Sequence, residues 1–199
     1  PLALSNAGTI THCWYRGGIT AKGSLGGRVY TNSGTIEACY VYTGRPTRGG
    51  RNEMYYGGWA GGIAYKNTGT IANSYFYGDI VQAQSGNTVR DIIGWGAIAY
   101  EKNSDTVSNC YYAAERDDGY GGKTEDQFLS GEVTYLLNGG TARDDWRQNR
   151  PADDTPVLDR SHAQVRKSGK NYVSLYPHVH CICGGSTTSG SHPQHSDVT

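Results

Sequence analysis

One phrase of this sequence occurs four times, and its clearest copy is Gly69-Thr70-Ile71-Ala72-Asn73-Ser74-Tyr75. The other copies occupy residues 8–14, 34–40 and 105–111. Each copy follows a short polar run that contains an asparagine, and the last three also follow a Gly-rich phrase that ends in Tyr30, Tyr65 or Tyr100. Agreement at this many positions indicates an internal repeat.

The spacing of the copies indicates short strands with insertions between them. Successive copies are offset by 26, 35 and 36 residues, and the variable length falls in loop-like stretches at 44–51 and 82–91. Within each phrase the residues alternate with a period of two, which is typical of a β-strand. We therefore expect an all-β fold, a right-handed parallel β-helix (a solenoid), with strands stacked at ~4.8 Å. The expected inward columns are Ile10, Ile36, Ile71 and Val107, and Cys13, Cys39, Ser74 and Cys110.

The composition agrees with short strands and frequent corners. The 199 residues include 29 Gly and 16 Tyr but only 2 Phe and 1 Met. Gly turns at little cost, and Tyr has a high strand preference. The 18 basic and 18 acidic residues cancel, so we expect no nucleic-acid partner. No stretch approaches the ~20 apolar residues of a membrane span, and because the first residues run straight into the repeat, we expect a piece of a longer protein.

The repeat resembles the GLUG repeat of bacterial surface proteins, which is named for a Gly-Leu-Xaa-Gly phrase. Residues 24–27, Ser-Leu-Gly-Gly, lie nearest to that phrase, and residues 67–75 match the rest of the pattern best. The resemblance covers residues 1–115 and departs in the fourth copy, where Asp105 and Val107 replace Gly and Ile. In that family such repeats occur in cell-wall-anchored adhesin-like proteins and beside the protease domain of IgA-specific zinc metallopeptidases. The resemblance implies an extracellular repeat domain that is not itself catalytic.

Residues 116–170 are expected to form a cap with one helix near 124–138. Thr124 and Gln127 have the spacing of a capping box, and Asn138-Gly139 is a typical helix end. The apolar face of this helix would consist of Phe128, Leu129, Val133, Leu136 and Leu137. A stack of strands exposes unpaired edges at its ends, so we expect the helix to lie across an open end.

Residues 171–199 contain a candidate zinc site. Cys181 and Cys183 supply two thiolates, and His192 and His195 supply two imidazoles, a set that suits tetrahedral zinc. The Cys-Xaa-Cys spacing is tighter than that of common zinc motifs. A structural zinc module and a linker therefore both stay open, with redox chemistry of the two thiols as a third interpretation. A catalytic zinc is not expected, because the chain has no HExxH motif.

The remaining residues favour binding or support over catalysis. Acidic pairs occur at 117–118, 144–145 and 153–154, outside the repeat strands, so we expect no enzyme activity in this chain. Recurring aromatic residues, among them Tyr42, Tyr77 and Trp59, could receive a host glycan or protein, or could stack to stabilise the repeats themselves. The five cysteines cannot all pair, and the three in the repeats suit buried free thiols.

The leading hypothesis is a non-catalytic extracellular repeat domain of a bacterial surface or secreted protein. It would serve as a stalk, a spacer or an adhesion and ligand-binding surface. The alternative is an accessory domain of a secreted enzyme, an IgA-type protease or a glycan-active hydrolase, whose catalytic part lies outside this chain. The expected location is extracellular, either secreted or attached to the cell wall, and zinc in the tail is the one expected cofactor.

Overall fold

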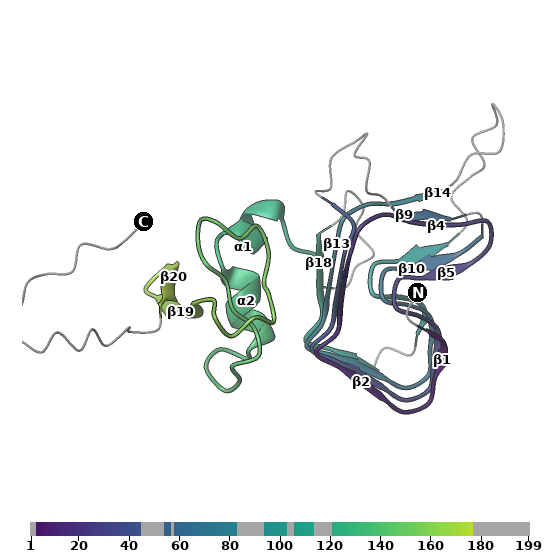
Figure 1. The fold of residues 1–199 in the computed structure, drawn as a ribbon, viewed down its shortest axis with the longest axis horizontal. Helices are drawn as coiled ribbons and strands as arrows, with labels where there is room; N and C mark the ends of the chain where they lie inside the picture. Colours follow the sequence, from purple (N-terminus) through teal and green to yellow (C-terminus); the bar gives the residue numbers. More distant parts are fainter. Residues whose placement is uncertain are drawn as a thin grey trace, which may run out of the picture.

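The chain folds mostly into short β-strands that stack as parallel sheets. The computed structural model describes residues 3–44, 54–56, 58–82, 94–102, 106–113 and 121–176. Neighbouring strands within each sheet come from successive sequence repeats. Figure 1 shows these strands lying over one another around a common interior. The arrangement is compatible with a parallel β-helix.

Five parallel sheets, named A to E in chain order, make up the repeat region. Sheet A contains β1 (Ala3–Asn6), β6 (Val29–Asn32), β11 (Ala64–Asn67) and β16 (Ala99–Lys102). Sheet B contains β2 (Thr9–Thr11), β7 (Thr35–Glu37), β12 (Thr70–Ala72) and β17 (Val107–Ser108). Sheet C contains β3 (Trp14–Arg16), β8 (Tyr40–Tyr42), β13 (Tyr75–Tyr77) and β18 (Tyr111–Ala113). Sheet D contains β4 (Ile19–Ala21), β9 (Met54–Tyr56) and β14 (Ile80–Gln82), and sheet E contains β5 (Leu25–Gly26), β10 (Ala60–Gly61) and β15 (Trp95–Gly96).

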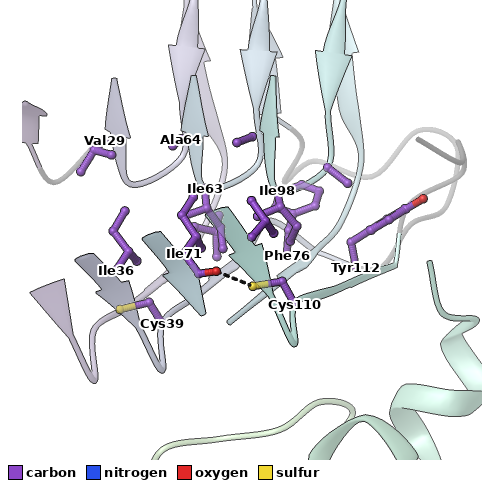
Figure 2. Packing of buried hydrophobic residues seen from close by; sticks show 14 of the residues in the cluster. Val29, Ile36, Cys39, Ile63, Ala64, Ile71, Phe76, Ile98, Cys110 and Tyr112 are labelled. Atoms are coloured by element: carbon purple, nitrogen blue, oxygen red, sulfur yellow. Dashed lines mark hydrogen bonds between the residues drawn. The ribbon is translucent and has the colours of Figure 1, made fainter. Parts of the chain in front are cut away.

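The register within sheet B confirms the predicted inward column. Ile10 pairs with Ile36, Ile36 with Ile71, and Ile71 with Val107. Ile36 and Ile71 are fully buried and lie against the residues of sheets A and C that line the same interior (Figure 2). The repeat motif therefore fixes which residues stack, because a shift by one residue would turn each isoleucine to the outside.

The second predicted column contains free thiols. Cys13, Cys39 and Cys110 are all free, with Cys39 and Cys110 buried and Cys13 half-buried. The Cys110 thiol donates a hydrogen bond to the Ile71 carbonyl oxygen at 3.5 Å (Figure 2). Burial raises the pKa of Cys110 to about 12, so this thiol acts as a small uncharged core residue.

Left-handed residues form the corner between sheets B and C in every repeat. His12, Ala38, Asn73 and Asn109 have φ angles of 52°, 48°, 47° and 47°. Asparagine adopts this conformation more readily than other side chains that carry a Cβ. Asn109 Nδ2 also donates to Asn73 Oδ1 at 2.7 Å, which links the last two corners.

A ladder of buried amides closes the strands of sheet A. Asn6 Nδ2 donates to Asn32 Oδ1, and Asn32 Nδ2 donates to Asn67 Oδ1, each at 2.7 Å. Asn67 Nδ2 continues the chain to Thr106 Oγ1 at 3.0 Å. The three asparagines are at most 7% exposed, so each amide depends on its neighbours for hydrogen bonds.

Glycines permit the sharp return from sheet E to sheet A. A Cβ at Gly61 would lie 1.7 Å from the Ala64 carbonyl oxygen, and a Cβ at Gly26 would lie 1.8 Å from the Val29 carbonyl oxygen. No other residue fits such a close backbone approach. The Gly-Gly phrase of the sequence repeat is therefore a steric requirement of this turn.

The C-terminal segment, residues 121–176, contains α1 (Glu125–Leu129), α2 (Glu132–Leu137) and an antiparallel hairpin of β19 (Gln164–Ser168) and β20 (Asn171–Leu175). The predicted capping box is confirmed, because Thr124 and Gln127 exchange side-chain to backbone hydrogen bonds of 2.9 and 3.2 Å. The prediction of one continuous helix is wrong. Gly131 has φ of 83° and separates two helices, since a left-handed residue cannot continue a right-handed helix.

The helices α1 and α2 lie against the flank of the repeats and not across an open end, which corrects the predicted position of the helix. Residues 121–123 do pair with the edge of β18, where the Tyr112 N–H donates to the Gly121 carbonyl oxygen at 3.2 Å and the Lys123 N–H donates to the Tyr112 carbonyl oxygen at 2.9 Å. Phe128, Val133, Leu137 and Trp146 form a buried cluster with the tyrosines on the outer face of sheet C. Figure 1 shows α1 and α2 beside β13 and β18. The outer face of sheet C presents large aromatic side chains, and their burial stabilises this position of the helices. Within the described residues, neither helix has the length and apolar character of a bilayer crossing.

Candidate binding surfaces

Two columns of aromatic side chains cover the outer face of sheet C. The first column runs through Trp14, Tyr40, Tyr75 and Tyr111, which are paired in register. Trp14 stacks on Tyr40 with ring centroids 6.1 Å apart, and Tyr40 stacks on Tyr75 at 4.9 Å. In the second column Tyr42 stacks on Tyr77 at 5.2 Å, and the Arg16 guanidinium lies over Tyr42 at 4.3 Å.

The C-terminal segment buries most of this aromatic face. The Phe128 ring packs edge-on against the rings of Tyr75 and Tyr77, with centroid distances of 5.6 and 5.0 Å. The ring centroids of Trp146 and Tyr75 are 5.3 Å apart. The Tyr75 hydroxyl donates to the Pro156 carbonyl oxygen at 2.6 Å. Burial raises the pKa of Tyr75 well above its usual range, so the phenol stays protonated as a donor.

This packing corrects part of the predicted binding surface. Tyr77 is fully buried, so it cannot contact a glycan or a partner protein. Tyr42 is half-buried between Tyr77 and Arg16. Within sheet C the rings stack on one another and on Phe128 of the C-terminal segment, the arrangement expected if the aromatic residues stabilise the repeats. Trp59, the third predicted residue, is 40% exposed and lies elsewhere, next to sheet E.

Ion pairs join the C-terminal segment to the first two repeats. Asp145 Oδ1 lies 3.0 Å from His12 Nε2, and Arg143 Nη2 lies 3.0 Å from Asp145 Oδ2 and 2.8 Å from Glu37 Oε1. Burial alone would raise the pKa of Asp145, but the hydrogen bonds from His12 and Arg143 outweigh it and lower that pKa. The carboxylate therefore has a structural role in this interface.

The other acidic residues predicted as pairs are also engaged in structural contacts. Asp144 accepts from Arg147 Nη2 at 2.6 Å. Asp153 Oδ2 lies 2.7 Å from His162 Nδ1. Each of these carboxylates thus has a side-chain partner in the C-terminal segment, and Asp144 remains half exposed. Asp117 and Asp118 lie outside the described residues.

A half-buried aromatic column lies on the outer face of sheet A, and the sequence analysis did not single out its three tyrosines as binding residues. The register puts Tyr30, Tyr65 and Tyr100 side by side, with Leu4 as the equivalent residue of the first repeat. The rings of Tyr30 and Tyr65 are 4.6 Å apart, and those of Tyr65 and Tyr100 are 5.8 Å apart. Trp59 extends the column, because its indole stacks on Tyr100 at 6.3 Å.

The surroundings of this sheet A column are polar and solvent-exposed. Lys66 Nζ lies 3.1 Å from Glu101 Oε2, and the Tyr65 hydroxyl donates to Glu101 Oε1 at 3.2 Å. The hydrogen bond from Lys66 is the main cause that lowers the pKa of Glu101. The site thus combines an aromatic stripe with a fixed positive and negative charge. Its signal in the sequence was the tyrosine that ends each Gly-rich phrase.

The ring spacing limits what this column can bind. At separations of 4.6–6.3 Å neighbouring rings already contact one another, so no sugar ring can insert between them. The column offers ring edges, hydroxyl groups, the exposed surface of Trp59 and the Leu4 side chain, which is 76% exposed. Such a mixed aromatic and polar surface is typical of protein recognition.

A small pocket lies between the end of α2 and β19. It has a volume of about 190 Å³ and is lined by Asn138, Arg143, Asp144 and Arg166, among others. Arg143 and Asp144 are already engaged by neighbouring groups, and the volume is below the ~300 Å³ of ordinary ligand sites. This pocket is therefore a weaker candidate than the sheet A column.

The predicted zinc ligands Cys181, Cys183, His192 and His195 lie outside the described residues. Within the part of the chain that the structure describes, no three His, Cys, Asp or Glu residues gather as a metal site. Comparisons of this chain with protein-family models, curated proteins and solved structures find no match.

Proposed function

We propose that this chain is a non-catalytic, extracellular repeat domain of a bacterial surface or secreted protein, built as a right-handed parallel β-helix, that binds a protein ligand. The observation that carries the proposal is the sheet A column beside a polar rim: Tyr30, Tyr65 and Tyr100 are in register and half-buried, and the exposed Trp59 stacks on Tyr100. The resemblance of the repeats to GLUG repeats supports the extracellular location.

We favour adhesion over a stalk or spacer, because the sheet A column runs across all four stacked strands of that sheet and offers a partner one continuous surface.

The polar residues of the described segments also favour binding over catalysis. The carboxylate of Asp145 joins the C-terminal segment to His12 of the first repeat. Asp144 and Asp153 pair with Arg147 and His162 within that segment. The stacked residues of the motif are apolar, aromatic or amide side chains, and these build the repeats. An enzyme would instead need polar groups converging on an open site.

The experiment compares three forms of the protein on arrays of extracellular proteins and of glycans. The surface variant is Trp59→Ala with Lys66→Glu, and the matched control is Trp14→Ala, because Trp14 is also exposed but lies on the sheet C flank. We expect the wild type and the control to bind a protein ligand, and the surface variant to lose at least about tenfold in affinity, as hot-spot residues do. Loss of a glycan signal in the surface variant would reassign the ligand to carbohydrate. Cleavage of an arrayed substrate by the chain would refute the non-catalytic proposal.

A further inference from the structure

Arg28 occupies a position in the core that is apolar in the later repeats. Its backbone N–H donates to the Ile63 carbonyl oxygen at 2.8 Å, and the Ile63 N–H donates to the Ile98 carbonyl oxygen at 2.9 Å. The three residues are therefore equivalent in successive repeats. Ile63 and Ile98 are at most 1% exposed and point into the core (Figure 2). Arg28 is itself only 4% exposed.

The guanidinium of Arg28 has no counter-ion among the described residues. Its Nε and Nη2 atoms are buried without a hydrogen-bond partner, and Arg28 takes part in none of the ion pairs in the described segments. An arginine side chain stays charged at every ordinary pH. A desolvated charge without a partner strongly opposes folding. We therefore expect an anion beside the Arg28 guanidinium.

The Cys39 thiol beside Arg28 does not supply that anion. Arg28 is hydrogen-bonded to the Cys39 side chain, and its charge acts to lower the pKa of the thiol, but burial is the largest influence and raises that pKa. The thiol donates a hydrogen bond to the Glu37 carbonyl oxygen at 3.2 Å, which requires its proton. Cys39 is thus a neutral neighbour of the guanidinium.

We propose that Arg28 binds a small monovalent anion, chloride, inside the second repeat. The two unpartnered nitrogens supply N–H donors, and the fixed positive charge supplies the attraction. Because Arg28 is only 4% exposed, its guanidinium is enclosed, which favours a monatomic ion over the larger sulfate or phosphate. Chloride acts here as a structural ligand that stabilises the folded state. This inference is independent of the ligand-binding surface.

The first test measures thermal and urea unfolding in sodium chloride and in sodium gluconate at equal ionic strength. For a dissociation constant on the order of 10 mM, raising chloride from about 10 to about 500 mM multiplies the folded-to-unfolded ratio about 25-fold. We expect this gain in the wild type and its absence in Arg28→Met, which keeps the side-chain length without the charge. Arg28→Ile matches Ile63 and Ile98 and is a second variant. Equal chloride dependence in the wild type and both variants would overturn the proposal.

A second test needs no variant. Crystals of the wild-type chain soaked in bromide should show an anomalous peak within hydrogen-bond distance of the Arg28 guanidinium. The absence of a peak there would overturn the assignment. A peak without any chloride dependence in solution would mean an adventitious ion only, and would also overturn it.

Discussion

Replacing Asn32 with alanine should destabilise the stack more than any surface substitution. Asn32 is the central member of the amide ladder in sheet A and is fully buried. Its Oδ1 accepts from Asn6, and its Nδ2 donates to Asn67 Oδ1 at 2.7 Å and to the Thr70 carbonyl oxygen at 3.2 Å. The alanine variant removes all of these bonds at once.

The expected loss follows from these contacts. Each neutral hydrogen bond contributes about 1 kcal/mol net, and an acceptor left buried without a donor costs a further ~1–3 kcal/mol. Asn67 is 1% exposed, so its Oδ1 is left in that state. We therefore expect Asn32→Ala to lower the free energy of unfolding by about 3 kcal/mol, a large share of the ~5–15 kcal/mol of an ordinary domain.

Urea denaturation followed by tryptophan fluorescence and by circular dichroism measures this loss. Asn171→Ala is the matched control, because Asn171 is exposed at the start of β20 and should change stability by less than about 0.5 kcal/mol. Asn32→Asp separates hydrogen bonding from packing, since its shape is conserved. At neutral pH the carboxylate cannot donate to Asn67, whereas its protonated form at about pH 3 can donate one bond.

Two results would refute this reasoning. The first is an Asn32→Ala variant whose stability lies within about 0.5 kcal/mol of the wild type. The second is an Asn32→Asp variant whose deficit relative to the wild type does not shrink as the pH is lowered.

Three further predictions concern sterics, charge and metal. Gly61→Ala places a methyl group 1.7 Å from a backbone carbonyl oxygen and should lower the free energy of unfolding by about 3 kcal/mol or more. Gly23→Ala, with no atom within 4 Å, should leave it unchanged in the same urea titration. Similar losses in the two variants would contradict the steric argument. Because the pKa of Asp145 is lowered in the folded state, its ion pairs stabilise the fold above about pH 4 and lose that effect as the pH falls below it. Asp145→Asn should therefore cost about 1 kcal/mol near neutral pH and little at about pH 2, and a deficit that is constant with pH would count against this. Plasma mass spectrometry of protein prepared without chelator should find about one zinc ion per chain, and the Cys181→Ser/Cys183→Ser variant should contain none. Metal-free wild-type protein would favour a linker at residues 171–199.

The sequence predicted local features that depend on the motif itself. The columns at Ile36 and Ile71 follow from alternation within each phrase, because period-two alternation fixes both the face and the register of a strand. The capping box at Thr124 and the helix end at Asn138 likewise involve only residues close in the chain. The break at Gly131 was missed, since the apolar spacing continues across it.

Only the tertiary structure decided which aromatic residues are available to a partner. Tyr77 and Tyr65 both recur in strands with alternating patterns, so nothing local distinguishes them. Phe128 packs onto the Tyr77 column and leaves the Tyr65 column open. That choice depends on contacts between residues about fifty positions apart, and such contacts leave no period in the sequence.

What the sequence by itself determined about this protein is its stack of in-register strands, because each repeat mainly contacts its neighbours and the motif encodes those contacts. The tertiary structure alone decided where the C-terminal segment docks, which surface stays exposed, and that Arg28 lies buried in a column of isoleucines. Burial is a property of the whole assembly: the same side chain is stabilising, neutral or costly according to what the rest of the chain places around it.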